Sequence, residues 1–386
     1  MFRGFIDLLT SLKLTIICLA AAMILIFAGT LAQVHLGIHE AQQRYFQSMF
    51  VWWPAEGRGF RIPVFPGGHL IGAVLLVNLI AAHTRRFRWN WRKLGIHLTH
   101  AGLIIMLAGG LFTDLWAVES HLRLSRGETK NYSEDTMHME LAVIDVSGND
   151  LDTVTAIPDS ILRRRRVIDH PSLPFRIVVK NFYQNSRLQM LGQAGAGAQP
   201  IANQGPGAQI AVQAVQRATA QDDRDIETAA IEIIPRQGGS SLGTWLVSDA
   251  LGAPQTFQLD GKTWLIALRP ERYYKPYSLT LQKFTHEKYA GTEIPKNFAS
   301  KVTLIDSDQS VNRDVLIYMN HPLRYGGETF YQAGFQKDDS ATILQVVHNP
   351  SFLAPYVACV IVGVGLLVQF GSHLIGFSRK QRAVPA

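Results

Sequence analysis

Four long apolar blocks stand out along the chain, separated by polar segments of unequal length. They cover residues 14–33, 69–84, 94–115 and about 352–377. A helix rises 1.5 Å per residue, so about 20 residues cross roughly 30 Å of hydrocarbon, and each block predicts a transmembrane helix. The first block is too long for the apolar core of a signal peptide and no small-residue cleavage site stands out, so we interpret it as a retained anchor.

Basic residues indicate which way these helices point. Five of them fill the connection between the second and third blocks: Arg85, Arg86, Arg88, Arg92 and Lys93. Such clusters stay in the cytoplasm, and the basic residues near both termini agree (Arg3, Lys13, Arg379, Lys380 and Arg382). We therefore expect cytoplasmic termini and an outer segment 117–350, with Trp52, Trp53 and Trp116 in an outer aromatic belt.

The long segment between the third and fourth blocks has the pattern of a β-rich domain. Short alternating runs follow one another: His138–Val146, Phe175–Phe182, Glu227–Ile234, Thr263–Leu268, Leu279–Phe284, Lys301–Ile305, Val315–Met319 and Thr342–Val347. Asp260-Gly261 predicts a two-residue hairpin turn. The fold class is therefore a membrane protein with four transmembrane helices (3+1) and a large extracytoplasmic, mostly-β domain, a sandwich or an open barrel.

Three regions follow from these patterns. They are a membrane region 1–116, an outer domain 117–350, and a last helix with a cytoplasmic tail, 351–386. Within the outer domain, residues 188–222 are rich in Gly, Ala and Gln. Such a segment has little apolar surface to bury, so we expect a mobile loop with a short helix near Ile210–Ala218. The run Arg163–Arg166 is interpreted as a solvated turn.

Composition excludes several classes of protein. The formal charge of +7 comes from the basic groups beside the apolar blocks, so it does not indicate nucleic-acid binding. The two cysteines, Cys18 and Cys359, both lie in apolar blocks, and no CxxC, CxxCH or zinc-site spacing occurs. No hydrolase or phosphate-binding signature is present either. We expect no catalytic residue and no catalysis by the chain alone.

Histidines are the remaining candidates for chemistry. His97 and His100 lie in the first two turns of the third block, on one helical face. An ionisable side chain within a span is costly and indicates function, although His97 could equally be an interfacial residue. Neutral imidazole is a good iron ligand, and the small residues Gly102 and Ala108–Gly110 would allow a helix or a flat macrocycle to approach. His100 is therefore the favoured axial ligand of a haem iron, with His97 as the second cofactor-binding candidate.

The other histidines are weaker candidates. His35 and His39 follow the first block, and His348 precedes the fourth, as loop or interface residues. His83 and His373 lie near the inner face, where their rings would extend toward the interface. Trp52-Trp53-Pro54 could form an aromatic platform, but an interfacial anchor is the favoured role.

Several short motifs resemble those of ResB-type (CcsB-type) cytochrome c biogenesis proteins. They are Ser11-Leu12-Lys13 with Gly29-Thr30 and Gln33, then His100–Gly110 followed by Arg126–Thr129, then Asn320–Gln332, and Asn349-Pro350 before the last span. The resemblance covers both ends of the chain and is weak over residues 150–300. The Gly/Ala/Gln-rich insertion and the compact outer domain depart from the family pattern.

The resemblance implies a subunit of the two-protein haem delivery and ligation machine called System II, in the bacterial inner membrane. The partner would be a ResC/CcsA-type membrane protein, and the complex, a cytochrome c haem lyase (synthase), would attach haem to apocytochrome c. The family's third-span histidine matches His100, which implies an axial ligand for non-covalent haem b in transit. A thioredoxin-like thiol reductase is a further candidate partner. The outer haem ligands belong to the partner in this family, so His35, His39 and His348 inherit no role.

Two alternatives stay open at this point. The chain could be an electron-transfer subunit with a permanent b-type haem, for which His83 with His97 is the internal candidate pair. It could also be a scaffold that positions its partner and binds no haem.

Overall fold

The chain folds into two compact units. The computed structural model describes residues 2–54, 60–86, 90–148, 151–164, 166–195, 198–217, 225–236, 238–292, 295–336 and 340–382. One unit comprises Met1–Val118 with His348–Ala386, and the other comprises Glu119–Val347. Of the predicted features, Arg88 and parts of the insertion 188–222 lie outside the described residues.

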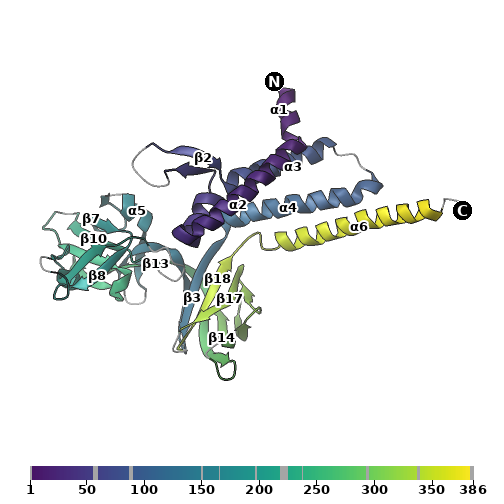
Figure 1. Cartoon of the computed structure of the whole chain (residues 1–386). Coiled ribbons are helices and arrows are strands. Elements are labelled where there is room, and N and C mark those ends of the chain that lie inside the picture. Colours follow the sequence, from purple (N-terminus) through teal and green to yellow (C-terminus); the bar gives the residue numbers. More distant parts are fainter. Residues whose placement is uncertain are drawn as a thin grey trace. The chain divides into compact units, whose positions relative to one another are not determined.

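The first unit is helical. Its elements are α1 (Phe2–Leu9), α2 (Leu12–Ala41), η1 (Gln42–Phe46), α3 (Gly68–Arg86), η2 (Trp91–Lys93), α4 (Leu94–Trp116) and α6 (Ala354–Arg382), with a small hairpin of β1 (Phe50–Trp53) and β2 (Ile62–Pro66). Among the residues that the structure describes, four helical segments are long and apolar enough to cross a membrane: Leu12–Phe46, Gly68–Arg85, Leu94–Trp116 and Ala354–Ser378. The four predicted helices are thus confirmed, and Figure 1 shows them.

The first apolar helix is longer than its apolar pattern predicts. The side chain of Ser11 accepts a hydrogen bond from the Lys13 N–H and caps its start. The element continues past Gln33 to Ala41, but it consists of two helical segments joined at a kink. The kink is at Gly37, whose φ of 77° is open to glycine. His35 and His39 follow the apolar block as predicted, and both are helical, with His35 before the kink and His39 after it.

A stripe of glycines joins α4 to α6. Gly95, Gly102 and Gly109 are buried at a spacing of seven residues. A Cβ at Gly95 would lie 2.7 Å from the Gln369 backbone N, and one at Gly102 would lie 2.6 Å from a methyl of Val362. The two helices run antiparallel, and the missing side chains let their backbones approach closely.

A buried asparagine connects the other helices. Asn78 in α3 is 3% exposed, accepts a hydrogen bond from the Thr15 hydroxyl at 2.7 Å, and donates to the Leu9 carbonyl at 2.6 Å. At the same end of α3, Arg85 contacts Asp7 of α1 at 2.6 Å. These contacts hold the turn between α1 and α2 against α3.

The second unit is built from β-strands around two large hydrophobic cores, with a third, smaller core beside them. A ten-stranded sheet has the order β15-β14-β13-β4-β3-β18-β17-β16, with β12 paired to β13 and β5 paired to β4, and a four-stranded sheet has the order β11-β10-β7-β6. Their strands are β3 (Val118–Ser125), β4 (Thr129–Asp145), β5 (Thr153–Pro158), β6 (Val167–Ile168), β7 (Phe175–Tyr183), β10 (Thr228–Pro235), β11 (Thr244–Ser248), β12 (Gln255–Leu259), β13 (Lys262–Lys288), β14 (Pro295–Asp306), β15 (Val311–Tyr318), β16 (Leu323–Tyr325), β17 (Glu328–Phe335) and β18 (Ala341–His348). One short helix, α5 (Asp159–Arg164), lies between β5 and β6.

Each core has its own architecture. In the first core the four-stranded sheet packs against one half of the large sheet, with the Phe175 ring 5.4 Å from Phe257 and 5.2 Å from Trp264. The second core, which includes Tyr277 and Phe330, comes entirely from the large sheet, so that sheet must curl around it. A sandwich and an open barrel were predicted as alternatives, and the unit contains a sandwich-like half and a barrel-like half.

One strand runs through both halves. The predicted strands Thr263–Leu268 and Leu279–Phe284 are parts of the single strand β13, which pairs with β4 along much of its length. Register shifts after Pro270 and before Leu279 accommodate Pro270 and Pro276, which have no N–H to donate to the sheet. The hairpin prediction is confirmed: Leu259 pairs with Lys262, and Asp260 and Gly261 have φ of 52° and 74°.

The insertion is more ordered than its composition suggests. Residues Ser186–Met190 form β8, which pairs with β9 (Ile210–Ala214), and a 3-10 turn η3 (Gly205–Gln209) precedes β9. Ala202 and Ile210 pack with Leu246 in a small separate core. The predicted helix near Ile210–Ala218 is wrong, because β-branched Ile210 and Val212 extend against β8, with Ile210 and Leu246 buried together.

Candidate functional site

Three histidines meet at one end of α3 and α4. The ring of His83, near the end of α3, lies 5.2 Å from the ring of His97 in an edge-to-face arrangement. It also stacks on His100, with centroids 5.6 Å apart and planes 22° apart. The histidine cluster, as we call these three residues, flanks the basic connection. The His83 ring turns to α4, and its extension toward the membrane interface stays a prediction.

A backbone contact orients His100. Its Nδ1 lies 2.8 Å from the carbonyl oxygen of Ile96, one turn earlier in α4. A carbonyl only accepts hydrogen bonds, so Nδ1 carries the proton and the lone pair resides on Nε2. That tautomer is the one a metal ligand needs, and a fixed second nitrogen holds the ring in one orientation.

The histidine cluster is suited to axial ligation and not to chelation. Within the described parts of the chain, no group of three or more His, Cys, Asp or Glu side chains converges on a point that could hold a metal ion. A haem iron already has four equatorial nitrogens, so it needs only one imidazole on a given face. The residues present therefore fit a haem better than a bare metal ion.

The small residues expected to admit a macrocycle have another role. Gly102 and Gly109 face α6, and at 3.6 residues per turn they lie on roughly the opposite side of α4 from His97 and His100. Gly110 is different, because a Cβ there would meet nothing within 4 Å. Close packing of helices explains the stripe, and only Gly110 leaves open space.

The other predicted candidates lie apart from this cluster. His35 and His39 are in α2, and His348 ends β18. His373 lies within α6, where its Nε2 is 2.7 Å from the side-chain nitrogen of Gln369.

A cavity of about 510 Å³ opens between the opposite ends of α3 and α4 and the end of α2. His69, in the first turn of α3, and Asp114, in the last turn of α4, both line it and pair through Nε2 and Oδ2. The Gln47 amide donates to the other oxygen of Asp114 at 2.7 Å. The sequence analysis treated His69 only as the first residue of an apolar block. The signal that could have identified this pair is a His at the boundary of one predicted span and an Asp at the boundary of the next.

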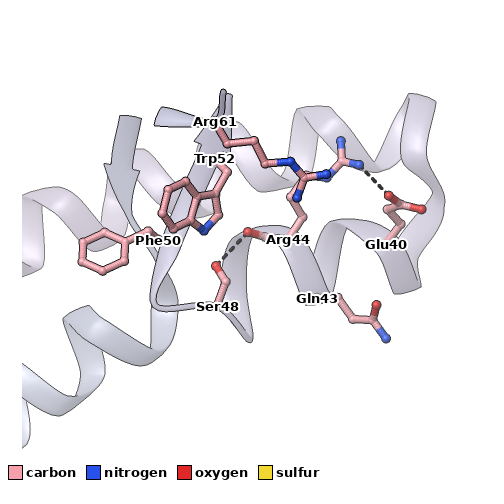
Figure 2. Close-up of a pocket in the computed structure, with 7 residues that line it drawn as sticks. All are labelled: Glu40, Gln43, Arg44, Ser48, Phe50, Trp52 and Arg61. Atoms are coloured by element: carbon pink, nitrogen blue, oxygen red, sulfur yellow. Dashed lines mark hydrogen bonds and ion pairs between the residues drawn. The ribbon is translucent and has the colours of Figure 1, made fainter. Parts of the chain in front are cut away.

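A smaller cavity of about 290 Å³ adjoins the β1–β2 hairpin (Figure 2). It is lined by Glu40, Gln43, Arg44, Ser48, Phe50, Trp52 and Arg61, and Arg44 pairs with Glu40 at 2.6 Å. Figure 2 shows the Arg44 guanidinium directed at Glu40 and the Ser48 hydroxyl directed at the Arg44 backbone carbonyl. Trp52 is 43% exposed and Trp53 is 64% exposed, as interfacial side chains would be.

A polar cluster lies beneath the motif Asn320–Gln332 in the second unit. Glu328 accepts hydrogen bonds from the Lys275 ammonium, at 2.6 Å, and from the Tyr277 hydroxyl. Burial, and then the bond to Glu328, raises the pKa of Tyr277. Gly326 has φ of 58°, and a Cβ there would lie 2.7 Å from the Tyr277 ring. The motif thus builds the barrel-like half.

The basic run at Arg163–Arg166 is not a solvated turn throughout. Arg163 lies in α5 and pairs with both Asp159 and Glu227, which are 3% and 6% exposed. Burial raises the pKa of Glu227 to about 7, against the opposing effect of Arg163. The positive charge of Arg163 therefore offsets two buried carboxylates. The interpretation of the basic run as a solvated turn is wrong for Arg163.

Comparisons with known proteins point to one family. The model of the ResB-like family matches residues 260–343, which run from the β12–β13 turn into β18 and include the Glu328 cluster. Protein NrfI of Wolinella succinogenes is 33% identical over 113 residues. That alignment covers 29% of this chain and 12% of NrfI, so the chain spans only a small part of that relative's length. The resemblance first inferred from short motifs is confirmed.

Proposed function

We propose that this chain is a ResB-type protein that serves in cytochrome c biogenesis, as a subunit of a membrane complex that moves haem across the membrane and attaches it to apocytochrome c. The family match and the relative NrfI support the general role. The histidine cluster supports the specific one.

The observation that carries the proposal is the orientation of His100. Its Nδ1 is engaged by the Ile96 carbonyl, so Nε2 is the nitrogen able to bind iron. The ring stands beside His83 on the face of α4 away from α6. In the proposed mechanism haem b enters from the cytoplasmic side, His100 Nε2 binds the iron on one face, and a ResC/CcsA-type partner supplies the other axial ligand.

The proposed topology follows from charge. The protein lies in the bacterial inner membrane. The basic connection between α3 and α4 and both termini are on the cytoplasmic side of that membrane. Three spans then precede the β-rich unit and one follows it, and that unit lies outside the membrane, where it meets apocytochrome c or a thiol reductase. Thioether bonds form from the thiols of the apocytochrome itself, so this chain holds and positions haem and needs no nucleophile of its own.

Co-purification with the partner tests the proposal. We expect the complex to carry non-covalent b-type haem, visible in its absorption spectrum, and His100→Ala to lose most of it. His97→Ala should lose less haem, because it leaves His100 and its contact with the Ile96 carbonyl in place.

His373→Ala is the matched control, because it removes an imidazole from α6 outside the histidine cluster. Its haem content should equal that of the wild type. Unchanged haem in His100→Ala, with the protein folded and the partner bound, would refute the assignment.

One observation favours a second function. His83 contacts both His97 and His100, so two imidazoles of a single chain lie close enough to serve one bound haem after a change of side-chain rotamer. A permanent haem for electron transfer would then belong to this chain alone. A stable, reversible midpoint potential in the isolated protein would favour that function over haem delivery.

A further inference from the structure

The larger cavity has a polar end and apolar walls. Its polar groups are the side chains of Gln33, Gln42, Gln47, His69 and Asp114. The walls are formed by apolar side chains and small residues from α2, η1, α3 and α4, among them Phe46, Met106, Gly72 and Gly110. Its volume of about 510 Å³ lies in the range of small-molecule sites. Such a lining suits an amphipathic molecule whose head forms hydrogen bonds.

Helix electrostatics do not explain the positions of His69 and Asp114, the two residues that pair in the cavity. His69 lies at the N-terminal end of α3, which favours negative charge, and Asp114 lies at the C-terminal end of α4, which favours positive charge. Asp114 is therefore at the unfavourable helix end for its charge, and both side chains are about a quarter exposed. Helix stability does not explain the pair, whereas a site that needs both groups does.

Charge narrows the class of ligand. Among the residues that line the cavity there is no Lys or Arg, and Asp114 is the only carboxylate. A phosphate headgroup or the propionates of a porphyrin would meet that carboxylate without a basic partner, which is unfavourable in an apolar surrounding. The ligand is therefore neutral, with oxygens that can accept from amide groups and donate to an imidazole.

We propose that this cavity binds a neutral quinone or quinol ring between α3 and α4. With Nε2–H donated to Asp114, the Nδ1 of His69 accepts a hydrogen bond from a quinol hydroxyl, and the glutamine amides donate to a quinone carbonyl. Gly72 and Gly110 leave backbone surface on which a flat ring can lie, since a Cβ at either would meet nothing within 4 Å. The apolar tail extends toward the lipid. Binding here is independent of the histidine cluster and of the proposed haem transfer.

Photolabelling of the full-length protein in phosphatidylcholine nanodiscs tests this assignment. The probe is an azido-benzoquinone with a decyl tail, and intact-mass spectrometry measures the labelled fraction. We expect saturable labelling that decylubiquinone competes away, with labelled peptides from α3 or α4. Gly110→Leu fills the cavity and should reduce labelling about tenfold or more, and His69→Leu should weaken competition about tenfold, an effect equivalent to the loss of one hydrogen bond.

Gly363→Leu is the matched control, because Gly363 lies in α6, does not line the cavity, and has open space around its Cβ. It should label like the wild type. Labelling that does not saturate, or that persists unchanged in Gly110→Leu, would overturn the proposal. So would equal competition by dioctanoylglycerol, which would make this a site for neutral lipid.

Discussion

The imidazole of His83 stacks on that of His100, with ring centroids 5.6 Å apart, and so joins the end of α3 to the first turns of α4. His97 meets the same ring edge-on at 5.2 Å. Three imidazoles thus share a small volume beside the basic connection. His83 is the central member, because it contacts both of the others.

Variants of His83 distinguish a role in positioning His100 from a role as a haem ligand. If the His83 ring only orients His100, then His83→Phe keeps the stack and should retain most of the haem of the complex, whereas His83→Ala should lose part of it. Visible absorption of the co-purified complex measures both variants. Loss of haem in His83→Phe as complete as in His100→Ala would show that His83 is itself a ligand.

The glycine stripe makes a prediction about helix packing. In Gly102→Leu the new side chain meets Val362 and the Ala358 carbonyl, so α4 and α6 must separate, and we expect a loss of stability of about 1–3 kcal/mol or more. Thermal unfolding in detergent measures it. Gly110→Leu is the matched control on the same helix and should unfold near the wild-type temperature. Equal unfolding temperatures for both variants would contradict this packing.

Glu328 has a structural task within the matched family region. Lys275 has a side chain only 4% exposed, and Glu328 is its partner at 2.6 Å. Glu328→Ala leaves a buried ammonium without a counter-charge and should destabilise the second unit by about 3–5 kcal/mol. Lys301 forms an exposed pair with Asp314 in the same half, so Asp314→Ala should cost much less stability than Glu328→Ala. Chemical denaturation followed by tryptophan fluorescence compares the two, and similar costs would disprove the distinction.

The raised pKa of Glu227 predicts how the stability of the folded protein depends on pH. Its pKa is about 7 in the folded protein and 4.5 in the absence of the fold, so the folded state binds more protons between these values. Stability should therefore fall as pH rises from about 4.5 to 7, by no more than roughly 3 kcal/mol, and then level off. Glu227→Gln should flatten this dependence. Glu232 on β10 pairs with Lys180 on β7, and Glu232→Gln should leave this dependence in place. Unfolding curves at several pH values decide between these outcomes.

Some of the fold follows directly from local pattern. The four apolar helices could be predicted because crossing hydrocarbon requires a length and an apolarity that any window of sequence displays. The Asp260-Gly261 turn could be predicted because both residues tolerate the positive φ that the turn requires. The family resemblance likewise lay in contiguous motifs.

Contacts between distant residues could not be predicted in the same way. The insertion has few large apolar residues, yet Ile210 is buried because Leu246 of another strand covers it. Arg163 belongs to a basic run that looks solvated, and only the approach of Glu227 makes it the partner of a buried charge. Burial of this kind depends on pairing over long sequence separations, which no local window contains.

The candidate sites show the same distinction between local sequence pattern and contacts of distant residues. Sequence alone determined that His97 and His100 share a helical face inside an apolar block, because a helix repeats every 3.6 residues. Only the tertiary structure decided that His83 completes their cluster, that Gly102 faces α6, and that His69 and Asp114 pair across a cavity. Helix periodicity is a property of neighbouring residues, whereas a cavity exists only where separate helices pack.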